Sequence, residues 1–218
     1  MNNPLLQLLV LAGIAIFLIL RLRSVLGTRD GYEPSRVEAP DAPRPRFDVI
    51  EGTAEEADHD ILDHAPAGSP TAQALAAMKA VEPSFGVMDF LNGAKSAYEM
   101  ILMAFERGDL TEVRPFLAEP VAAAFQSVID ARTANGQTVT AQYIGTRETS
   151  LAGAEYDRDT GMAVVTVRFV GELIAATRDA QGNLIEGDPK APRKQRDTWT
   201  FARHMGQDDP NWQLVATG

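Results

Sequence analysis

The hydrophobic pattern of this chain changes period near residue 137, and this change constrains the fold more than any other feature. Before it, apolar residues recur at helical spacing, as at Phe90, Leu91, Ala94 and Tyr98. After it, apolar and polar residues alternate, as strands do when one face is buried. Helices followed by strands with short turns predict an α+β fold, with N-terminal helices on the concave side of a curved, four-stranded antiparallel sheet.

The boundaries of these elements follow from turn and capping residues. Gly108 ends the first long helix, Pro115 limits a second helix over 109–117 to about two turns, and Pro120 opens a third helix that closes at Asn135-Gly136. The third helix is expected to bury Val121, Ala124, Phe125, Val128 and Ile129. The predicted strands cover residues 138–143, 163–175, 198–204 and 212–217, and a polar loop is expected over 187–194.

The chain begins with an apolar run that has the properties of a membrane anchor. From Pro4 to Leu20 the only polar side chain is Gln7, and Arg21 and Arg23 follow directly. A helix over this run is about 28 Å long, close to the ~30 Å hydrocarbon core of a bilayer. Arginines at the C-terminal flank alone predict a single-pass topology, with the N-terminus outside and the rest of the chain in the cytoplasm. A cleaved signal peptide is the weaker alternative, since the run lacks a basic n-region and a small-residue cleavage site.

Charge divides the chain into three parts. Residues 1–29 carry +3, residues 30–84 carry −8 and residues 85–218 carry −5. The middle part is rich in proline and acids, which predicts a linker with one short helix over 71–82, and residues 85–218 are expected to form the folded domain. An acidic chain of this kind lacks the basic footprint of a nucleic-acid-binding protein.

The sequence shows no motif for catalysis or for binding a metal or cofactor. Glycine-rich phosphate loops, nucleophile elbows and paired-histidine zinc motifs are absent from the sequence. His59 and His64 stand in an acidic stretch that is best interpreted as solvated linker. We therefore predict no enzymatic activity, no cofactor and no metal. One alternative stays open: a small-molecule-binding or isomerase-like pocket could use the acid–base groups of Tyr98, Tyr143, Glu172 and Asp197.

Three stretches of the sequence resemble the Tim-forty-four-like domain family, and in particular its anchored alphaproteobacterial members, the TimA-type adaptors. They are the Arg21-to-Gly27 flank of the apolar run, the segment from Ala97 to Phe125, and the segment from Val165 to Thr217. The third contains Asp197-Thr198-Trp199-Thr200-Phe201 and Pro210-Asn211-Trp212. The resemblance covers the anchor and most of residues 88–218.

The resemblance implies a sheet like those of nuclear transport factor two and the cystatins, enclosing an apolar groove. It also implies a scaffold at the bacterial inner membrane, where the relative in mitochondria links a translocation channel to a chaperone and contacts lipid. The chaperone-recruiting N-terminal region of that relative has no counterpart here. The expected partners are therefore membrane lipid, through the N-terminal helix, and an unidentified protein: translocation machinery, a chaperone or a membrane complex.

Aromatic residues of the predicted strands are the candidate groove. Trp199 and Trp212 can either anchor the sheet against the helices or line a groove that holds an apolar peptide or an acyl chain. The candidate partner-binding residues are Tyr98, Phe169, Trp199, Phe201 and Trp212. A purely structural subunit of a membrane complex is the remaining interpretation.

Overall fold

The computed structural model describes residues 58–218, and the predicted anchor and most of the predicted linker lie outside the described residues. The described elements run in the order α2 (His59–Leu62), α3 (Pro70–Val81), α4 (Val87–Arg107), η1 (Arg114–Phe116), α5 (Glu119–Ala134), β1 (Thr138–Asp157), β2 (Met162–Arg178), β3 (Leu184–His204) and β4 (Gln213–Thr217). Among these helices none is long and apolar enough to cross a membrane.

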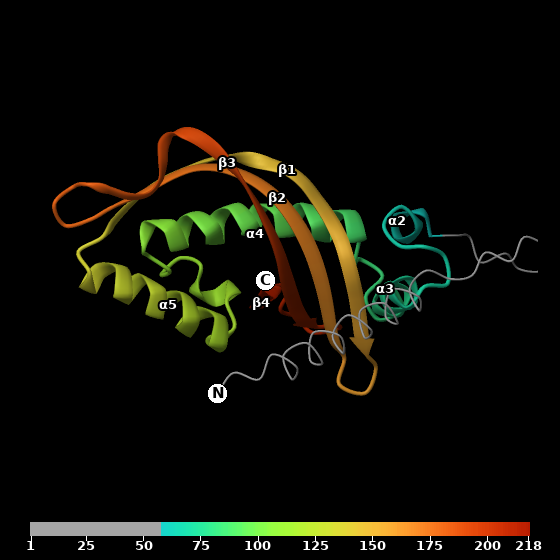
Figure 1. Cartoon of the computed structure of the whole chain (residues 1–218). Helices are drawn as coiled ribbons and strands as arrows, with labels where there is room; N and C mark the ends of the chain where they lie inside the picture. The colour runs from blue at the N-terminus through green and yellow to red at the C-terminus, as the bar shows by residue number, and fades with distance from the viewer. Residues whose placement is uncertain (1–57) are drawn as a thin grey trace, which may run out of the picture. The chain divides into compact units, whose positions relative to one another are not determined.

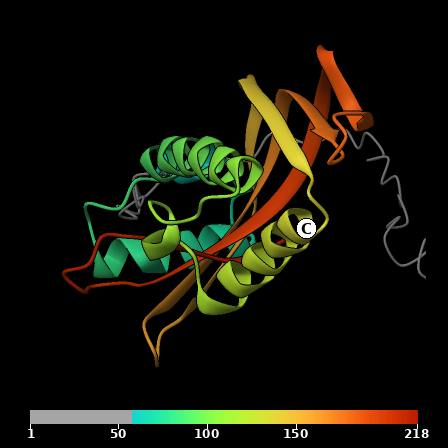
Figure 2. The ribbon, with the colours of Figure 1, turned by 90° about the vertical axis from the view of Figure 1, so that its left-hand side faces the viewer.

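The four strands form one antiparallel sheet in the order β1-β2-β3-β4, which arches over α4 (Figure 1). Hairpin turns at Asp157–Gly161 and Asp179–Asn183 join β1 to β2 and β2 to β3. The β2–β3 hairpin projects away from the helices (Figures 1 and 2). The predicted α+β fold, with helices packed on a four-stranded antiparallel sheet, is confirmed.

Periodicity explains how the layers meet. In α4, the stripe from Phe90 to Leu102 is buried, and Gly108 ends the helix in a left-handed conformation with φ of 76°. In β2, every second residue from Ala163 to Leu173 is buried, so Val165, Val167 and Phe169 face α4 while Arg168 is exposed.

The segment before α4 packs on the domain through both apolar and charged contacts. The sequence predicts a linker over residues 58–82 and leaves open whether the helix over 71–82 packs on the domain, but Leu75 and Met78 of α3 are fully buried. The Asp60 carboxylate accepts hydrogen bonds from the backbone N–H groups of Val87 (2.8 Å) and Met88 (3.0 Å), at the start of α4. Burial opposes ionisation of Asp60, but the Lys79 ammonium 2.7 Å away and these backbone donors hold its pKa below the ordinary value.

Three local predictions were wrong, each for a steric or packing reason. The second helix is only a 3₁₀ turn, Arg114–Phe116, because Pro115 cannot donate to an α-helical ladder. The polar loop at 187–194 lies within β3: the strand stays extended, and residues 189–192 bulge between the pairs Leu173–Arg193 and Ala175–Asp188. In α5, Ala124 is exposed and Val128 is 43% exposed instead of buried, because the helix buries only the narrower stripe of Val121, Ala122 and Ile129.

Candidate functional site: two cavities around an aromatic row

Aromatic side chains from α4 and the sheet form a continuous row on the concave face. Tyr98 stacks on Phe169 with ring centroids 4.4 Å apart and an interplanar angle of 9°. Trp199 meets the edge of Tyr98 at 4.8 Å, and Phe201 lies next along β3, 6.3 Å from Trp199. Such offset and edge-on pairs are favoured by the ring quadrupoles. The row continues through Phe90 to Trp212, whose rings are 4.7 Å apart.

The candidate groove residues therefore lie together, but they do not share one surface. Tyr98 and Phe169 are fully buried and form the centre of the core. Trp199 borders a cavity on one side of the row, whereas Phe201 and Trp212 border a second cavity on the other side. The row thus separates two cavities with different lining residues.

A partly buried hydrogen bond links the row to a carboxylate. The Tyr98 hydroxyl donates to Asp197 Oδ2 at 2.5 Å, and Asp197 Oδ1 accepts from Gln195 at 3.2 Å. Burial and the neighbouring Asp197 charge raise the pKa of Tyr98 far above its usual value, so the phenol remains a donor. Gly171 makes this approach of Tyr98 to the sheet geometrically feasible, because a Cβ there would lie 2.9 Å from the Tyr98 hydroxyl oxygen.

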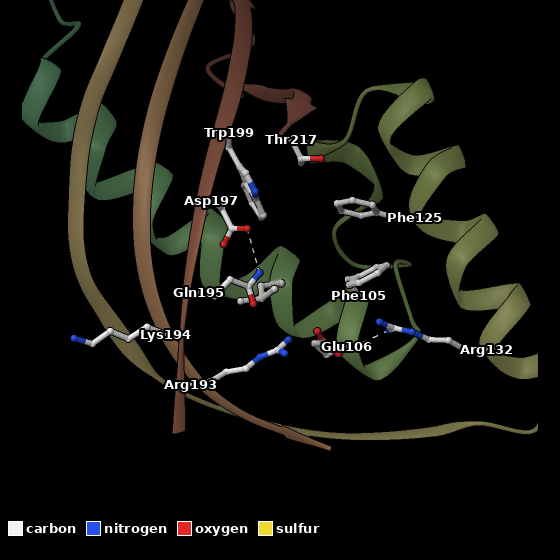
Figure 3. Close-up of a pocket in the computed structure, with 11 residues that line it drawn as sticks. Phe105, Glu106, Phe125, Arg132, Arg193, Lys194, Gln195, Asp197, Trp199 and Thr217 are labelled. Carbon is white, nitrogen blue, oxygen red and sulfur yellow. Dashed lines mark hydrogen bonds and ion pairs between the residues drawn. The ribbon is translucent and has the colours of Figure 1, made fainter. Parts of the chain in front are cut away.

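The first cavity, called here the charged cavity, opens between α4, α5 and β3 and has a volume of about 390 Å³ (Figure 3). Its apolar wall is made by Phe105 of α4, Phe125 of α5 and Trp199 of β3. Figure 3 shows Arg193, Gln195, Asp197 and Trp199 following one another along β3 on the side that faces these phenylalanines. The remaining lining residues are Leu102, Glu106, Arg132, Lys194 and Thr217.

The charges of this cavity are only loosely paired. Glu106 has a side chain that is 10% exposed and lies 3.8 Å from Arg132, too far for a hydrogen bond. Burial raises the pKa of Glu106, with Arg132 and Arg193 acting in the opposite direction. The Arg132 guanidinium instead stacks over the Phe105 ring at 4.6 Å, and its buried Nη1 has no hydrogen-bond partner. A ligand with both apolar and anionic groups would complement the aromatic wall and the two arginines of this cavity.

The second cavity, called here the aromatic cavity, has a volume of about 440 Å³ and lies beside the N-terminal half of α4. Its apolar wall includes Phe85, Phe90, Phe201 and Trp212. It contains one close ion pair: Arg203, with a side chain 6% exposed, donates to Glu82 at 2.6 Å and lies over the Trp212 ring at 5.4 Å, while its Nε has no hydrogen-bond partner within residues 58–218. The hydrogen bond from Arg203 holds the pKa of Glu82 below its ordinary value.

Comparison with known proteins identifies the domain that contains these cavities. The model of the family described as "Tim44-like domain" matches residues 71–218. The chain belongs to this family. The matched range begins within α3, so α3 and everything after it belong to the Tim44-like domain.

Comparison with solved structures adds a distant similarity. The crystal structure of the intermembrane space region of the chloroplast protein ARC6 aligns with 59% of this chain and 94% of that chain, at 12% identity and a TM-score of 0.39. No curated protein sequence matches the chain closely enough to count as a relative.

The other candidate residues occupy different places in the Tim44-like domain. Glu172 lies away from both cavities and pairs with Arg147 at 2.6 Å. Tyr143 of β1 packs at 6.4 Å from Tyr98 and bonds to Thr146. His59 begins α2, and within residues 58–218 no cluster of three metal-ligating side chains is present. Of the acid–base groups considered, only Tyr98 and Asp197 come together at a cavity.

Sequence reasoning missed the polar residues of the charged cavity. Glu106 and Arg132 lie on different helices and are 26 positions apart in the chain, and no spacing rule brings them together. A signal for Arg193 was present, because residues 189–196 contain Lys190, Arg193, Lys194 and Arg196 without an acid in an otherwise acidic domain. That run was interpreted as a loop and given no role.

Proposed function

We propose that the chain is a membrane-anchored adaptor whose Tim44-like domain binds a protein segment or a lipid close to the membrane. The observation that carries the proposal is the charged cavity: an aromatic wall with two guanidinium groups at an opening between α4, α5 and β3. Apolar walls with a few placed charges are the usual construction of a binding pocket. Membership of the Tim44-like domain family supports the adaptor role.

The proposed mechanism is local concentration. Residues 1–29 would hold the chain in the inner membrane, with the N-terminus in the periplasm and the domain in the cytoplasm. A linker of roughly 30–40 residues would keep the domain within about 100 Å of the bilayer, so even weak binding in the cavity would act on membrane-proximal partners. Protein translocation and membrane-complex assembly are the processes that such an adaptor would serve.

Photocrosslinking tests this function directly. A photoreactive phenylalanine analogue replaces Phe125, which lines the charged cavity, and Val128 serves as the control because it is 43% exposed on the same helix and lines none of the described cavities. After irradiation in native membranes, protein or lipid adducts are expected at position 125 and not at 128. Equal yields at both positions, or no adduct at 125, would contradict the proposal.

The hydrogen bond between Tyr98 and Asp197 favours one alternative function. Asp197 lines the charged cavity, so its carboxylate could take a proton from a small carbon acid while Tyr98 remains a neutral donor. This isomerase-like interpretation predicts exchange of a ketone α-proton for deuterium that depends on Asp197. Exchange that is unchanged in Asp197→Asn would dismiss it.

A further inference from the structure

One edge of the sheet stops being paired beside the charged cavity. The register of β4 with β3 covers residues 199–202, and one further pair joins Thr198 to Gly218 through bonds of 2.6 and 2.8 Å. On its other side β3 stays paired with β2 from His204 back to Leu184. Within residues 58–218, no strand pairs with the outer edge of β3 from Arg193 to Asp197.

The alternation of a β-strand identifies the free backbone groups. In an antiparallel ladder, successive residues direct their N–H and C=O groups to opposite sides. Thr198 exchanges both of its hydrogen bonds with Gly218, so Arg196 and Lys194 direct theirs to the same, unoccupied side. Two donors and two acceptors are thus available in line with β4, as in the edges that receive an added strand.

Side chains along this edge alternate in chemistry as well as in direction. Arg193, Gln195 and Asp197 line the charged cavity on the concave side, together with Trp199 (Figure 3). Lys194 points the opposite way from Arg193 in the same view. Arg196 is two residues from Lys194, so it lies on the same face of the strand, and it is exposed. An added strand would therefore meet the charged cavity on one face and basic side chains on the other.

The edge is also the most basic part of an acidic molecule. Lys190, Arg193, Lys194 and Arg196 are the basic edge, and no acid interrupts residues 189–196 in a chain of net charge −10. In the described part of the chain, none of the four has a carboxylate within ion-pair distance. Glu172, the register neighbour of Lys194, pairs with Arg147 instead. Unpaired basic side chains favour an acidic partner.

We propose that the outer edge of β3 binds an extended acidic segment of a partner protein by strand addition, continuing the line of β4. Apolar residues of the segment enter the charged cavity between Phe105 and Phe125, and the alternating acidic residues face Lys194 and Arg196. This inference deepens the adaptor function proposed above and rests on it, since it names the chemistry of the partner for the same cavity.

Selection from a peptide library measures the predicted pattern. Full-length chain in lipid nanodiscs is used to select from displayed random nonapeptides, followed by affinity measurement on the enriched peptides. Alternation of Asp or Glu with aromatic or aliphatic residues is expected. Enrichment of basic peptides, of peptides with helical spacing, or of no peptide would overturn the proposal. The last outcome would leave the basic edge as a guard against sheet-to-sheet aggregation.

A matched pair of variants separates backbone pairing from charge. Arg196→Ala removes only the side chain, and Arg196→Pro also removes the outward N–H, which proteins tolerate on an open edge. We expect Arg196→Ala to weaken an enriched acidic peptide about 2- to 5-fold. Arg196→Pro should weaken it a further ~3- to 10-fold, as one backbone hydrogen bond requires. Equal affinities of the two variants would refute strand addition.

Two further measurements guard this comparison. Lys194→Ala and Lys194→Pro repeat the test one pair along the strand, and circular dichroism selects whichever proline variant keeps the native spectrum. Arg196→Glu, which reverses the charge on the face that the acidic residues would meet, is expected to shift the selected peptides away from acidic residues. Unchanged selection by Arg196→Glu would contradict the assigned role of charge.

The experiments can refute the acidic peptide as the partner without refuting the adaptor function. Crosslinks at position 125 to lipid alone, together with equal affinities of the Ala and Pro variants, would refute the peptide and retain a binding cavity. Binding of the nanodisc-free chain to anionic vesicles that is abolished by the basic-edge variants would assign the edge to a membrane surface instead. Absence of any adduct at position 125 would refute the adaptor function itself.

Discussion

The two cavities flank the same aromatic row, yet the arginine–glutamate pair that borders each has a different geometry. In the aromatic cavity, Arg203 and Glu82 form a close ion pair at 2.6 Å, and the guanidinium lies over Trp212. In the charged cavity, Arg132 and Glu106 stay 3.8 Å apart, and Arg193 has no carboxylate within ion-pair distance in the described part of the chain. Charges that satisfy each other stabilise the fold, whereas charges left without close partners remain available to a ligand.

Truncating the two cavity arginines should give the largest contrast. Arg203→Met leaves the half-buried Glu82 carboxylate without its partner, and loss of this charged hydrogen bond is expected to cost about 2–3 kcal/mol of unfolding free energy. Arg132→Met, at the loosely paired site, should cost less than ~1 kcal/mol. Chemical denaturation of both variants measures the difference. Equal losses of unfolding free energy would mean that the two arginines contribute equally to the stability of the fold.

Adding a methyl group at Gly171 of β2, next to Tyr98, should give the next largest loss of stability. Gly171→Ala places a Cβ against the Tyr98 ring, which cannot move away because it is stacked on Phe169. We expect a loss of about 1–3 kcal/mol. Gly153→Ala is the control, since no atom lies within 4 Å of its Cβ position. A control loss as large as that at 171 would show that strand flexibility, and not contact with Tyr98, is responsible.

Removing the Tyr98 hydroxyl should have a smaller, pH-dependent effect. Tyr98→Phe loses one partly buried hydrogen bond, worth about 1 kcal/mol. The folded state keeps this phenol neutral because its pKa is raised, while the unfolded chain ionises near pH 10.0. Wild-type stability is therefore present below that pH and is lost as the pH rises further. Thermal melting between pH 8 and 11 should show a shallower decline for Tyr98→Phe.

The two half-buried glutamates, Glu82 and Glu106, should give the smallest effects, and these should differ in sign. The pKa of Glu82 is lowered by Arg203, so its stabilising contribution is present above its ordinary pKa of 4.5 and is lost as the pH falls through its folded-state pKa. The pKa of Glu106 is raised by burial, so its ionised form destabilises the folded state, and protonation at acid pH removes this destabilisation.

Melting curves between pH 3 and 7 test this difference. Glu82→Gln should lose less stability on acidification than the wild type, and Glu106→Gln should lose more. If both variants changed the acid-induced loss of stability in the same direction, the two glutamates could not be assigned different electrostatic environments.

The sequence predicted the parts of this molecule that depend on local periodicity. The buried stripe of α4 and the alternation of β2 place Tyr98 and Phe169 face to face, so the aromatic row could be anticipated as a group. The division of the row between two cavities could not be predicted, because it depends on how α5 packs against the sheet. Helical periodicity predicts that Val128 is buried, although it is exposed.

Two long-range contacts were also invisible in the sequence. Asp60 caps a helix that begins 27 residues later, although it stands in a stretch whose composition is that of a linker. The continuation of β3 through Pro189 and Pro192 was hidden because proline normally ends a strand. It is tolerated here where residues 189–192 bulge out of the register with β2. Both contacts arise from tertiary pairing, which local propensity does not encode.

The capping of α4 by Asp60 has a mechanical consequence. Any tension carried along the chain from its N-terminal side enters the domain near Asp58 and Asp60, which Lys79 holds at 2.8 and 2.7 Å. From there it passes to the backbone of Val87 and Met88 through two hydrogen bonds loaded together. The first turn of the helix that carries Tyr98 is thus the point at which a pull on the chain would reach the aromatic row.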